Sequence, residues 1–224
     1  MEDKNREAIA LMKEKKYEEA AQQLTEIIEA YPNEALGYIN FGNLLLQMND
    51  VTRAERFFLK AIELDQDAAT AFYGLGNAYY QSETYDKAQE HFQKAIELGM
   101  EESDVYYMIG LTITKQQLHR FAVPYFMRAA ELDPDDVEKL FQYGLTLAKC
   151  EYIEESKKVF NRVLKKDEQH SDAHYNLGVI AVYEDRLKDA LNHFNLALEI
   201  QPEHILAANG KKRVEERIQN GDKK

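Results

Sequence analysis

The 224-residue chain carries 40 acidic against 28 basic side chains, a net charge of −12, and one cysteine. This balance argues against a nucleic-acid partner, because affinity for a phosphate backbone comes from clustered Lys and Arg. Cys150 alone excludes an internal disulfide and fits a reducing compartment. The charged start, Met1 to Lys16, lacks an apolar signal core, and no apolar run approaches the roughly 18 residues of a membrane span. We therefore expect a soluble, cytoplasmic protein.

A glycine recurs every 34 residues along the chain. The series is Gly42, Gly76, Gly110, Gly144 and Gly178. A fixed period of this length indicates a solenoid built from one repeated supersecondary unit. It predicts one solenoid domain over 1–224, with repeats at 1–34, 35–68, 69–102, 103–136, 137–170 and 171–204 and a capping helix at 205–219.

Small and aromatic residues share the period. Repeat position 20 holds Ala54, Ala88, Ala122, Ser156 and Ala190, and position 24 holds Phe58, Phe92, Phe126, Phe160 and Phe194. Pro32, Pro134 and Pro202 close three of the units. This pattern resembles the tetratricopeptide repeat over residues 1–204. The resemblance implies an all-α fold, a right-handed α-solenoid (superhelix) of antiparallel helix pairs.

Each repeat is expected to hold two helices. Positions 4, 7, 8 and 11 are spaced i, i+3, i+4, i+7 and form one face of a first helix, and positions 20, 24, 27 and 28 do the same for a second. A glycine inside a helix costs about 0.5–1 kcal/mol relative to alanine, so its recurrence indicates close packing between helices. We expect about three-quarters helix and no sheet.

Local exceptions lead to further predictions. Gly99 is expected to cap a helix end. Pro124 falls in a second helix and is tolerated only if that helix starts near His119 or Arg120, which would leave the proline in the first turn.

Both ends depart from the repeat in ways that predict solvated caps and a monomer. Lys4 and Glu7 replace an aromatic and a large apolar residue in repeat 1. After residue 204 the packing strip continues on one helix as Ala207, Gly210, Val214 and Ile218, while Lys211, Lys212 and Glu215 are charged. Residues Gln219 to Lys224 are expected to fray.

The first helices carry a second apolar row that the core does not require. Position 5 reads Ile39, Tyr73, Tyr107, Phe141 and Tyr175. The resemblance implies that first helices line a concave groove and that positions 2, 5, 6, 9, 12 and 13 reach ligands. The predicted groove residues are Asn40, Asn43, Tyr73, Asn77, Tyr80, Asp104, Tyr107, Leu111, Glu138, Phe141, Gln142, Tyr175 and Asn176. For positions 9 and 12, packing between repeats explains the row equally well.

The polar residues of this row indicate the ligand. In the subfamily that grips a C-terminal carboxylate of chaperones, only Asn43 matches the clamp, and Asp104 replaces one of its lysines. Because Asp104, Glu138 and Asp172 would repel a carboxylate, we expect a protein or peptide with a mixed apolar and basic segment.

Sites for catalysis or metals are weakly indicated. His170 and His174 have an i, i+4 spacing that metal ligands use, but His174 stands where other repeats pack an aromatic residue. Cys150 is expected to be a buried structural thiol, and a G-x-G at Gly74 and Gly76 lies in a helix rather than after a strand. We expect no cofactor.

The predicted function is a non-enzymatic scaffold or adaptor that holds an extended or helical partner segment in its groove. Three alternatives stay open: a regulator whose superhelical pitch changes when a short signalling peptide binds, a metal protein or enzyme centred on His170 and His174, and a self-assembling array.

Overall fold

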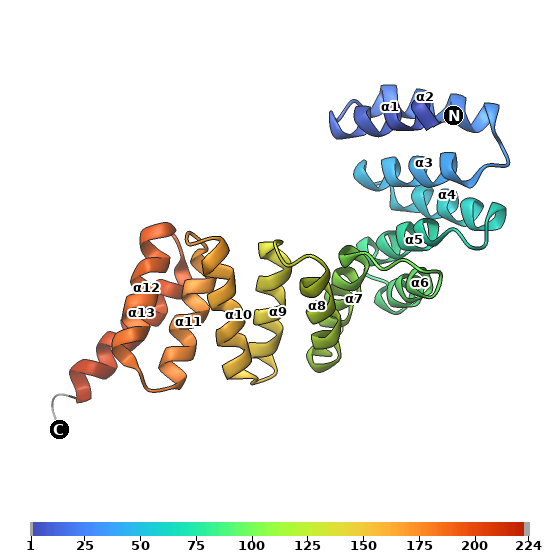
Figure 1. Cartoon of the computed structure of the whole chain (residues 1–224). Coiled ribbons are helices and arrows are strands. Elements are labelled where there is room, and N and C mark those ends of the chain that lie inside the picture. Colours follow the sequence, from blue (N-terminus) through green and yellow to red (C-terminus); the bar gives the residue numbers. More distant parts are fainter. Residues whose placement is uncertain (1, 222–224) are drawn as a thin grey trace. The chain divides into compact units, whose positions relative to one another are not determined.

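The computed structural model describes residues 2–221, where it contains thirteen α-helices and no strand, with 80% of the chain helical. The first helices of the repeats are α1 (Glu2–Lys13), α3 (Ala35–Gln47), α5 (Ala69–Gln81), α7 (Ser103–Lys115), α9 (Val137–Lys149) and α11 (Ser171–Tyr183). The second helices are α2 (Tyr17–Ala30), α4 (Val51–Leu64), α6 (Tyr85–Glu97), α8 (His119–Leu132), α10 (Ile153–Lys166) and α12 (Leu187–Ile200). The last helix is α13 (Ile205–Gly221). The predicted all-α solenoid of helix pairs is confirmed (Figure 1).

The helices follow the 34-residue register closely. From α3 onward the first helices begin at 35, 69, 103, 137 and 171, and α13 begins at 205, where a seventh first helix would start. The capping helix thus begins as expected but continues through Gly221, so residues 219–221 are helical rather than frayed. The rest of the segment expected to fray, residues 222–224, lies outside the described residues.

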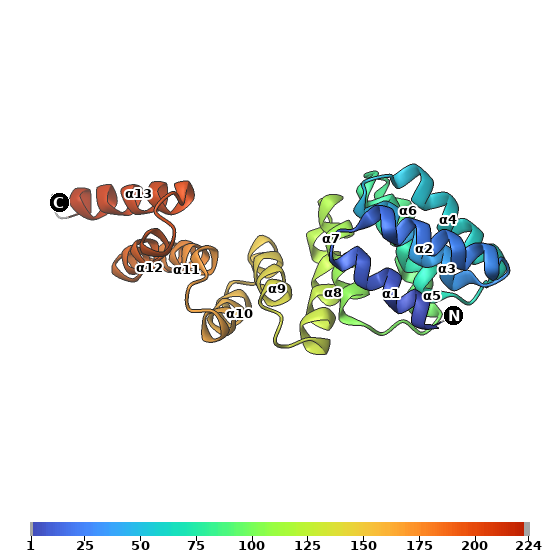
Figure 2. The ribbon, with the colours of Figure 1, turned by 90° about the horizontal axis from the view of Figure 1, so that it is seen from above.

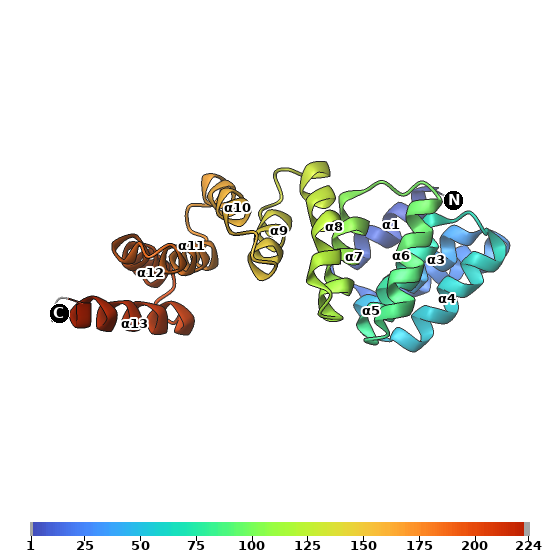
Figure 3. The same ribbon diagram turned by 90° about the horizontal axis from the view of Figure 1, so that it is seen from below.

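The chain forms two compact units, one ending at Leu118 and the other beginning at His119. Within the N-terminal unit, α1 to α6 pack as pairs, and α3, α5 and α7 each pack on the second helix of the preceding pair (Figure 2). Within the C-terminal unit, α9 packs on α8 and α10, and α13 packs on both α11 and α12 (Figure 3). Within the two units, α2, α4, α6, α10 and α12 are thereby each held between two neighbouring helices of the same unit.

The repeat glycines make room for the repeat phenylalanines. A Cβ atom added at Gly76 would lie 2.6 Å from Phe92 Cε1, and one at Gly178 would lie 2.6 Å from Phe194 Cε1. Both rings are at most 1% exposed. Gly74 is explained in the same way, because its Cβ would lie 2.2 Å from Phe58 Cε1. The close packing that the recurring glycine indicated is therefore contact between a helix backbone and an aromatic ring.

The turns within the repeats share a backbone conformation that the sequence did not reveal. At repeat position 15 the chain adopts a positive φ of 58–65° in six non-glycine residues. They are Lys15, Asn49, Glu83, Gln117, Glu151 and Asp185. The left-handed conformation costs an L-residue about 1–2 kcal/mol, so the tight connection is maintained against local preference.

Gly99 and Pro124 behave differently from each other. Gly99 follows the C-cap residue of α6 with φ 92°, and its N–H donates to the Ile96 carbonyl at 2.9 Å, as a cap should. Helix α8 begins at His119, as predicted, but Pro124 is then its sixth residue. The expectation of a first-turn proline was therefore wrong, since Pro124 lacks the N–H that would bond to the Arg120 carbonyl.

Positions 4 and 23 form a contact between the two helices of a repeat. In repeat 2 the ring centroids of Tyr38 and Phe57 are 6.2 Å apart, and in repeat 3 those of Phe72 and His91 are 6.1 Å apart. In repeat 6 the pair is His174 and His193, whose Nδ1 atoms are 3.3 Å apart. Burial lowers the pKa of all three histidines, most directly because their charged forms lose hydration.

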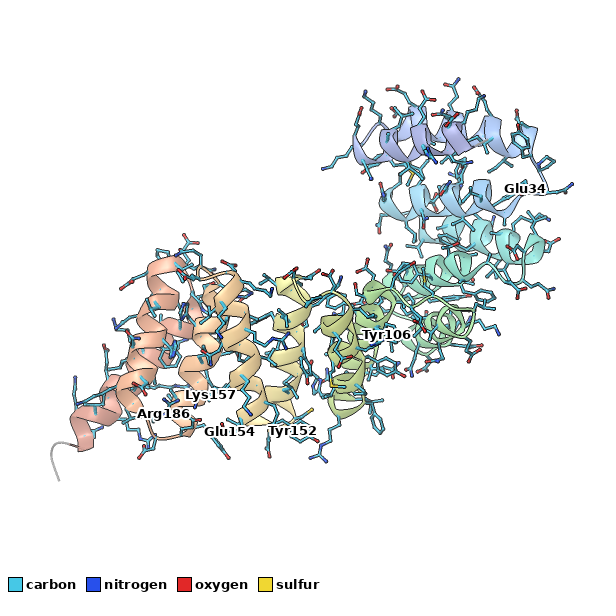
Figure 4. All side chains as sticks on the ribbon, viewed as in Figure 1. Glu34, Tyr106, Tyr152, Glu154, Lys157 and Arg186 are labelled. Carbon is cyan, nitrogen blue, oxygen red and sulfur yellow. The ribbon has the colours of Figure 1, made fainter. Side chains whose placement is uncertain are left out.

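An ion cluster connects repeats 5 and 6 at one edge of the C-terminal unit. Lys157 on α10 donates to both carboxylate oxygens of Glu184, at 2.8 and 3.0 Å, and Arg186 Nε donates to the same carboxylate at 2.7 Å. Figure 4 shows Lys157 and Arg186 close together at this edge. The hydrogen bond from Lys157 is the largest influence that lowers the pKa of Glu184.

Candidate functional site

The predicted groove residues lie on the first helices, and the structure gives each of them a definite environment within its own unit. In the N-terminal unit, Asp104 is exposed, while Asn43, Asn77 and Leu111 are half-buried. Neither Asn43 nor Asn77 makes a side-chain hydrogen bond to any residue that the structure describes. The donors and acceptors of both amides are therefore not engaged by the described part of the chain.

Asn40 differs from these two asparagines, and its predicted role needs correction. Its side chain is 6% exposed, and its Nδ2 donates to Asn5 Oδ1 at 2.7 Å. Asn5 is 3% exposed. The two amides satisfy each other between α1 and α3, because a buried polar group left without a partner is costly. Asn40 thus joins repeats 1 and 2 and offers no amide to a ligand.

Three tyrosines of the N-terminal unit remain candidates. Tyr73, Tyr80 and Tyr107 are all half-buried. The Tyr73 ring packs at 5.6 Å from Phe92, and the Tyr80 ring meets Tyr85 edge-on at 5.8 Å. Burial raises the pKa of Tyr80, so it stays a neutral hydroxyl donor at physiological pH.

In the C-terminal unit, Phe141 is part of the core rather than an exposed anchor. It is 9% exposed, its ring is 5.7 Å from Phe160, and the imidazole of His170 packs on it at 4.6 Å. His170 is the N-cap of α11, and its Nδ1 accepts from the Ala173 N–H at 3.2 Å. The cap residue covers the ring, so the expected anchor role of Phe141 does not hold.

Polar groove residues of this unit pair with each other along the helices. Gln142 Nε2 donates to Glu138 Oε1 at 2.9 Å, and Asn176 Nδ2 donates to the Asp172 carbonyl at 2.8 Å. The Asp172 carboxylate lies 3.1 Å from His204 Nε2. Glu138 and Asp172 are both exposed, so their negative charge faces solvent.

An open apolar cavity lies between α11 and α13. Its volume is about 330 Å³. It is lined by Tyr175, Val179, Val182, Phe194, Leu206, Asn209, Gly210, Arg213 and Val214. Val179 is 42% exposed and Leu206 is 57% exposed, so part of each side chain remains accessible to a ligand. Here the second apolar row of repeat 6 remains accessible.

The side chains at positions 9 and 12 of the second apolar row differ in how deeply they are buried. Leu46, Ala148 and Val182, all at position 12, are partly buried and pack against the core of their own unit. At position 9, Leu145 also packs on the core, but Val179 is largely exposed. Packing between helices thus accounts for Leu46 and Ala148. In contrast, Val182 both packs on the core and lines the cavity, and Val179 at position 9 of repeat 6 is accessible.

Residues of α13 were missed as site residues. The expected packing strip is correct: Ala207 and Val214 are at most 3% exposed, and a Cβ at Gly210 would lie 2.8 Å from Phe194. The cavity residues Leu206, Asn209 and Arg213 hold repeat positions 2, 5 and 9 of a seventh first helix. Continuing the 34-residue register past residue 204 would have identified them. Arg213 forms no ion pair with any residue that the structure describes.

His174 and Cys150, which were considered for metal binding and catalysis, are buried and contact other parts of the fold. His174 is 9% exposed, and its Nε2 lies 3.3 Å from the Glu168 carbonyl. Among the described residues, no group of three His, Cys, Asp or Glu side chains could hold a metal ion. Cys150 is 6% exposed, and burial raises the pKa of its thiol, which keeps it protonated and unreactive. No helix within residues 2–221 is long and apolar enough to cross a bilayer.

Comparisons with known proteins agree with this architecture. Tetratricopeptide repeat models match residues 6–34, 39–103, 103–136 and 171–204. A comparison with curated proteins found no match. PilF of Pseudomonas aeruginosa is 17% identical with a TM-score of 0.81, covering 95% of this chain and 96% of PilF. MamA of Desulfovibrio magneticus RS-1 is 21% identical with a TM-score of 0.70, covering 76% of this chain and 96% of that structure. These two share the fold.

A third solved structure is more similar in sequence. YrrB, described as a TPR protein with an unusual peptide-binding site, is 42% identical with a TM-score of 0.79. The match covers 86% of this chain and 99% of YrrB. Proteins of this kind are generally interaction scaffolds rather than enzymes. The chain belongs to the tetratricopeptide repeat family.

Proposed function

We propose that the protein is a non-enzymatic scaffold whose first helices hold a segment of a partner protein. The fold and its relatives support a protein-interaction role, and the cavity between α11 and α13 is the observation that carries the proposal further. Its accessible apolar walls suit one large side chain, and burying such a side chain stabilises a complex by about 1.5–3 kcal/mol. The six repeats and the capping helix act as a single cytoplasmic domain in this proposal.

The partner segment carries apolar and basic residues. In the C-terminal unit the exposed carboxylates of Glu138 and Asp172 favour a cation, while Arg213 at the cavity disfavours one on the side of α13. A lysine or arginine of the partner therefore lies toward α9 and α11, with the apolar side chain in the cavity. In the N-terminal unit Asp104 and the tyrosines of α5 and α7 provide the same combination of charge and rings.

Peptide selection tests this proposal. Random short peptides displayed on phage are selected on the intact, monomeric protein and then tested on Val179→Asp, which places a charge in the cavity wall. Peptides that require Val179 are expected to contain an aromatic or aliphatic residue next to Lys or Arg, and to bind more weakly as salt rises. Tyr175→Ala should weaken the binding of the same peptides by about 1–2 kcal/mol.

The controls distinguish binding from folding. Phe141→Ala is unsuitable as a binding variant, because removing a buried phenylalanine costs about 3–5 kcal/mol of stability. Val179 is 42% exposed, so its replacement should cost much less stability than that of Phe141, and the Val179→Asp variant should melt in one cooperative transition near that of the parent. If peptides bind the Val179→Asp variant as tightly as the parent, or if the selected peptides are acidic, this assignment of the cavity is wrong.

A further inference from the structure

The outer face of α8 differs from the equivalent face of every other second helix. Position 19 holds Phe121 in repeat 4, where the other repeats hold Glu19, Arg53, Lys87, Glu155 and Asp189. Position 22 holds Pro124, where the others hold Gln22, Arg56, Glu90, Lys158 and Asn192. Position 25 holds Met127, where the others hold Thr25, Leu59, Gln93, Asn161 and Asn195. Positions 19 and 22 are thus apolar in repeat 4 alone, and position 25 is apolar in repeats 2 and 4.

These three residues form one strip that faces solvent. They are spaced by three residues and lie on one side of the helix. Phe121 is 68% exposed and Met127 41% exposed, and Pro124 is exposed as well. The core of α8 is made by other residues, because Ala122, Phe126 and Ala129 are fully buried. The strip therefore adds little to the packing of its own helix.

Pro124 shows that the strip is unfavourable for the helix itself. In the second turn of α8 it removes the N–H that would bond to the Arg120 carbonyl. A residue retained for the stability of the helix would not remove one of its backbone hydrogen bonds. An exposed phenylalanine, proline and methionine on one face, where the other second helices have polar residues at every equivalent position except Leu59, indicate a role outside the helix.

The charges around the strip determine what it can bind. Arg120 and Arg128 flank it, and Arg128 also pairs with Glu131 at 3.3 Å. Helices α8 and α10 both pack on α9, and together they carry seven basic against three acidic side chains in a chain of net charge −12. On α10, Lys158, Arg162 and Lys165 are exposed. The second helices of repeats 4 and 5 are thus locally basic.

We propose that the outer face of α8, formed by Phe121, Pro124 and Met127, is a second docking surface for a protein segment that carries an apolar side chain next to Asp or Glu. Positive charge beside the strip attracts carboxylates and steers such a segment toward Phe121. A second copy is a poor occupant, because an antiparallel two-fold contact centred on Pro124 would place Arg120 opposite Arg128 of the other copy. The site is separate from the cavity at α11 and α13 and prefers the opposite charge.

A counter-selection with displayed random peptides tests the proposal on the full-length protein. The counter-selecting variant is Phe121→Glu, Pro124→Lys and Met127→Asn, which gives α8 the residues that α10 has at the same three positions. Peptides enriched on the parent are expected to lose at least about tenfold in affinity for this variant, as the loss of a central aromatic contact implies. They should be rich in Asp or Glu beside an aromatic or aliphatic residue.

Two measurements separate binding from structure. The melting temperature of the triple variant should equal or exceed that of the parent, because position 124 regains a hydrogen-bond donor. A matched variant of α10, Glu155→Ala with Asn161→Ala, should bind the selected peptides as the parent does. Peptides that respond to Val179→Asp and not to the triple variant belong to the cavity at α11 and α13, so the two sites succeed or fail independently.

Several outcomes would overturn the proposal. Peptide affinities unchanged in the triple variant would show that the strip is not a docking surface, and basic or uncharged selected peptides would refute its charge preference. Sedimentation of the parent, but not of the triple variant, with vesicles of phosphatidylserine and phosphatidylcholine would assign the face to a membrane. A dimer that is present in the parent and absent in the triple variant would assign it to a second copy.

Discussion

The N-terminal and C-terminal units share one helix register but fill equivalent contacts with different chemistry. Between positions 4 and 23, repeat 3 of the N-terminal unit packs Phe72 on His91, whereas repeat 6 of the C-terminal unit opposes His174 and His193. The distances between rings are similar, 6.1 and 5.6 Å. The backbone and the small residues set the distance between the rings. The side chains at positions 4 and 23 can therefore differ between the units, and they determine how the stability of each unit depends on pH.

The two units also differ in the charged contacts that join their helices and repeats. In the C-terminal unit Lys139, whose side chain is 8% exposed, pairs with Asp133 at 3.0 Å and Asp136 at 3.3 Å. The cluster of Lys157, Glu184 and Arg186 connects two repeats of the same unit. In the N-terminal unit, position 21 of repeat 2 instead holds Glu55, which accepts a hydrogen bond from Tyr79 of repeat 3 at 2.8 Å, and burial raises the pKa of Tyr79 to about 12. The C-terminal unit should therefore be the more sensitive to acid and salt.

The largest expected effect concerns the packing that both units share. In Gly74→Ala, a Cβ would lie 2.2 Å from Phe58 Cε1, and the ring cannot retreat because the backbone of Gly42 is on its other side. We expect this variant to lose about 1–3 kcal/mol in the free energy of unfolding, measured in urea. In the C-terminal unit, Gly144→Ala is the matched control, with its nearest contact at 3.0 Å. Equal losses in the two variants would show that the distances do not govern the cost.

The second largest effect should be a difference between the two units in how their stability depends on acid. Because burial lowers the pKa of His174 and His193, the unfolded chain binds protons before the folded one does. Their contribution to stability is complete above about pH 6.5 and falls as the pH decreases below it. Hydrogen exchange should show α11 and α12 losing protection at about pH 5.5, and His174→Phe should reduce this loss.

The reverse substitution sharpens the same comparison. Phe72→His would give repeat 3 the histidine pair of repeat 6 and should make α5 and α6 lose more protection in acid than in the parent, where burial lowers the pKa of His91 alone. If protection of α11 and α12 is independent of pH in the parent, the proposed role of the histidine pair fails.

The smallest effect should be equal in both units. Glu83 and Glu151 occupy the same turn position with φ 58° and 65°. Glycine has no Cβ penalty there, so Glu83→Gly and Glu151→Gly should each raise the free energy of unfolding by roughly 0.5–1 kcal/mol after the greater freedom of the unfolded chain is counted. Asn49→Gly should gain less, because asparagine tolerates this conformation. A gain in one unit only would mean that the turns are not equivalent.

Most of the fold follows from the sequence because a period of 34 places every helix. The glycines, alanines and phenylalanines repeat along the first and second helices, and the helix starts at 35, 69, 137 and 171 coincide with the predicted repeat boundaries. The positive φ at position 15 was not predicted, because lysine, glutamate and glutamine give no sign of it. The start of α8 at His119 was predicted, but five residues then precede Pro124, which is more than a first turn holds.

The site was less predictable because it depends on which side chains find partners. Asn40 and Asn43 look alike in sequence, yet only Asn40 meets an asparagine of the neighbouring helix. Phe141 and Tyr175 each pack on a repeat phenylalanine and on an imidazole, yet Phe141 is 9% exposed while Tyr175 is only half-buried. Asn5 lies about one repeat from Asn40, and His170 lies in a connector, so the periodic pattern does not predict either contact. The cavity needed α13, whose outward residues had been assigned to a polar cap.

Helix α13 also determines how the array can be lengthened. The ring of Phe194, 1% exposed, is covered on one side by Gly178 of its own repeat and on the other by Gly210 of α13. Gly210 stands at repeat position 6, where Gly74 covers Phe58 between repeats 2 and 3. An engineered repeat inserted between residues 204 and 205 would therefore find a glycine-lined surface already in place, provided that it carries its own glycine at position 6. Extension beyond Gly221 would instead have to replace the outward charges of the terminal helix.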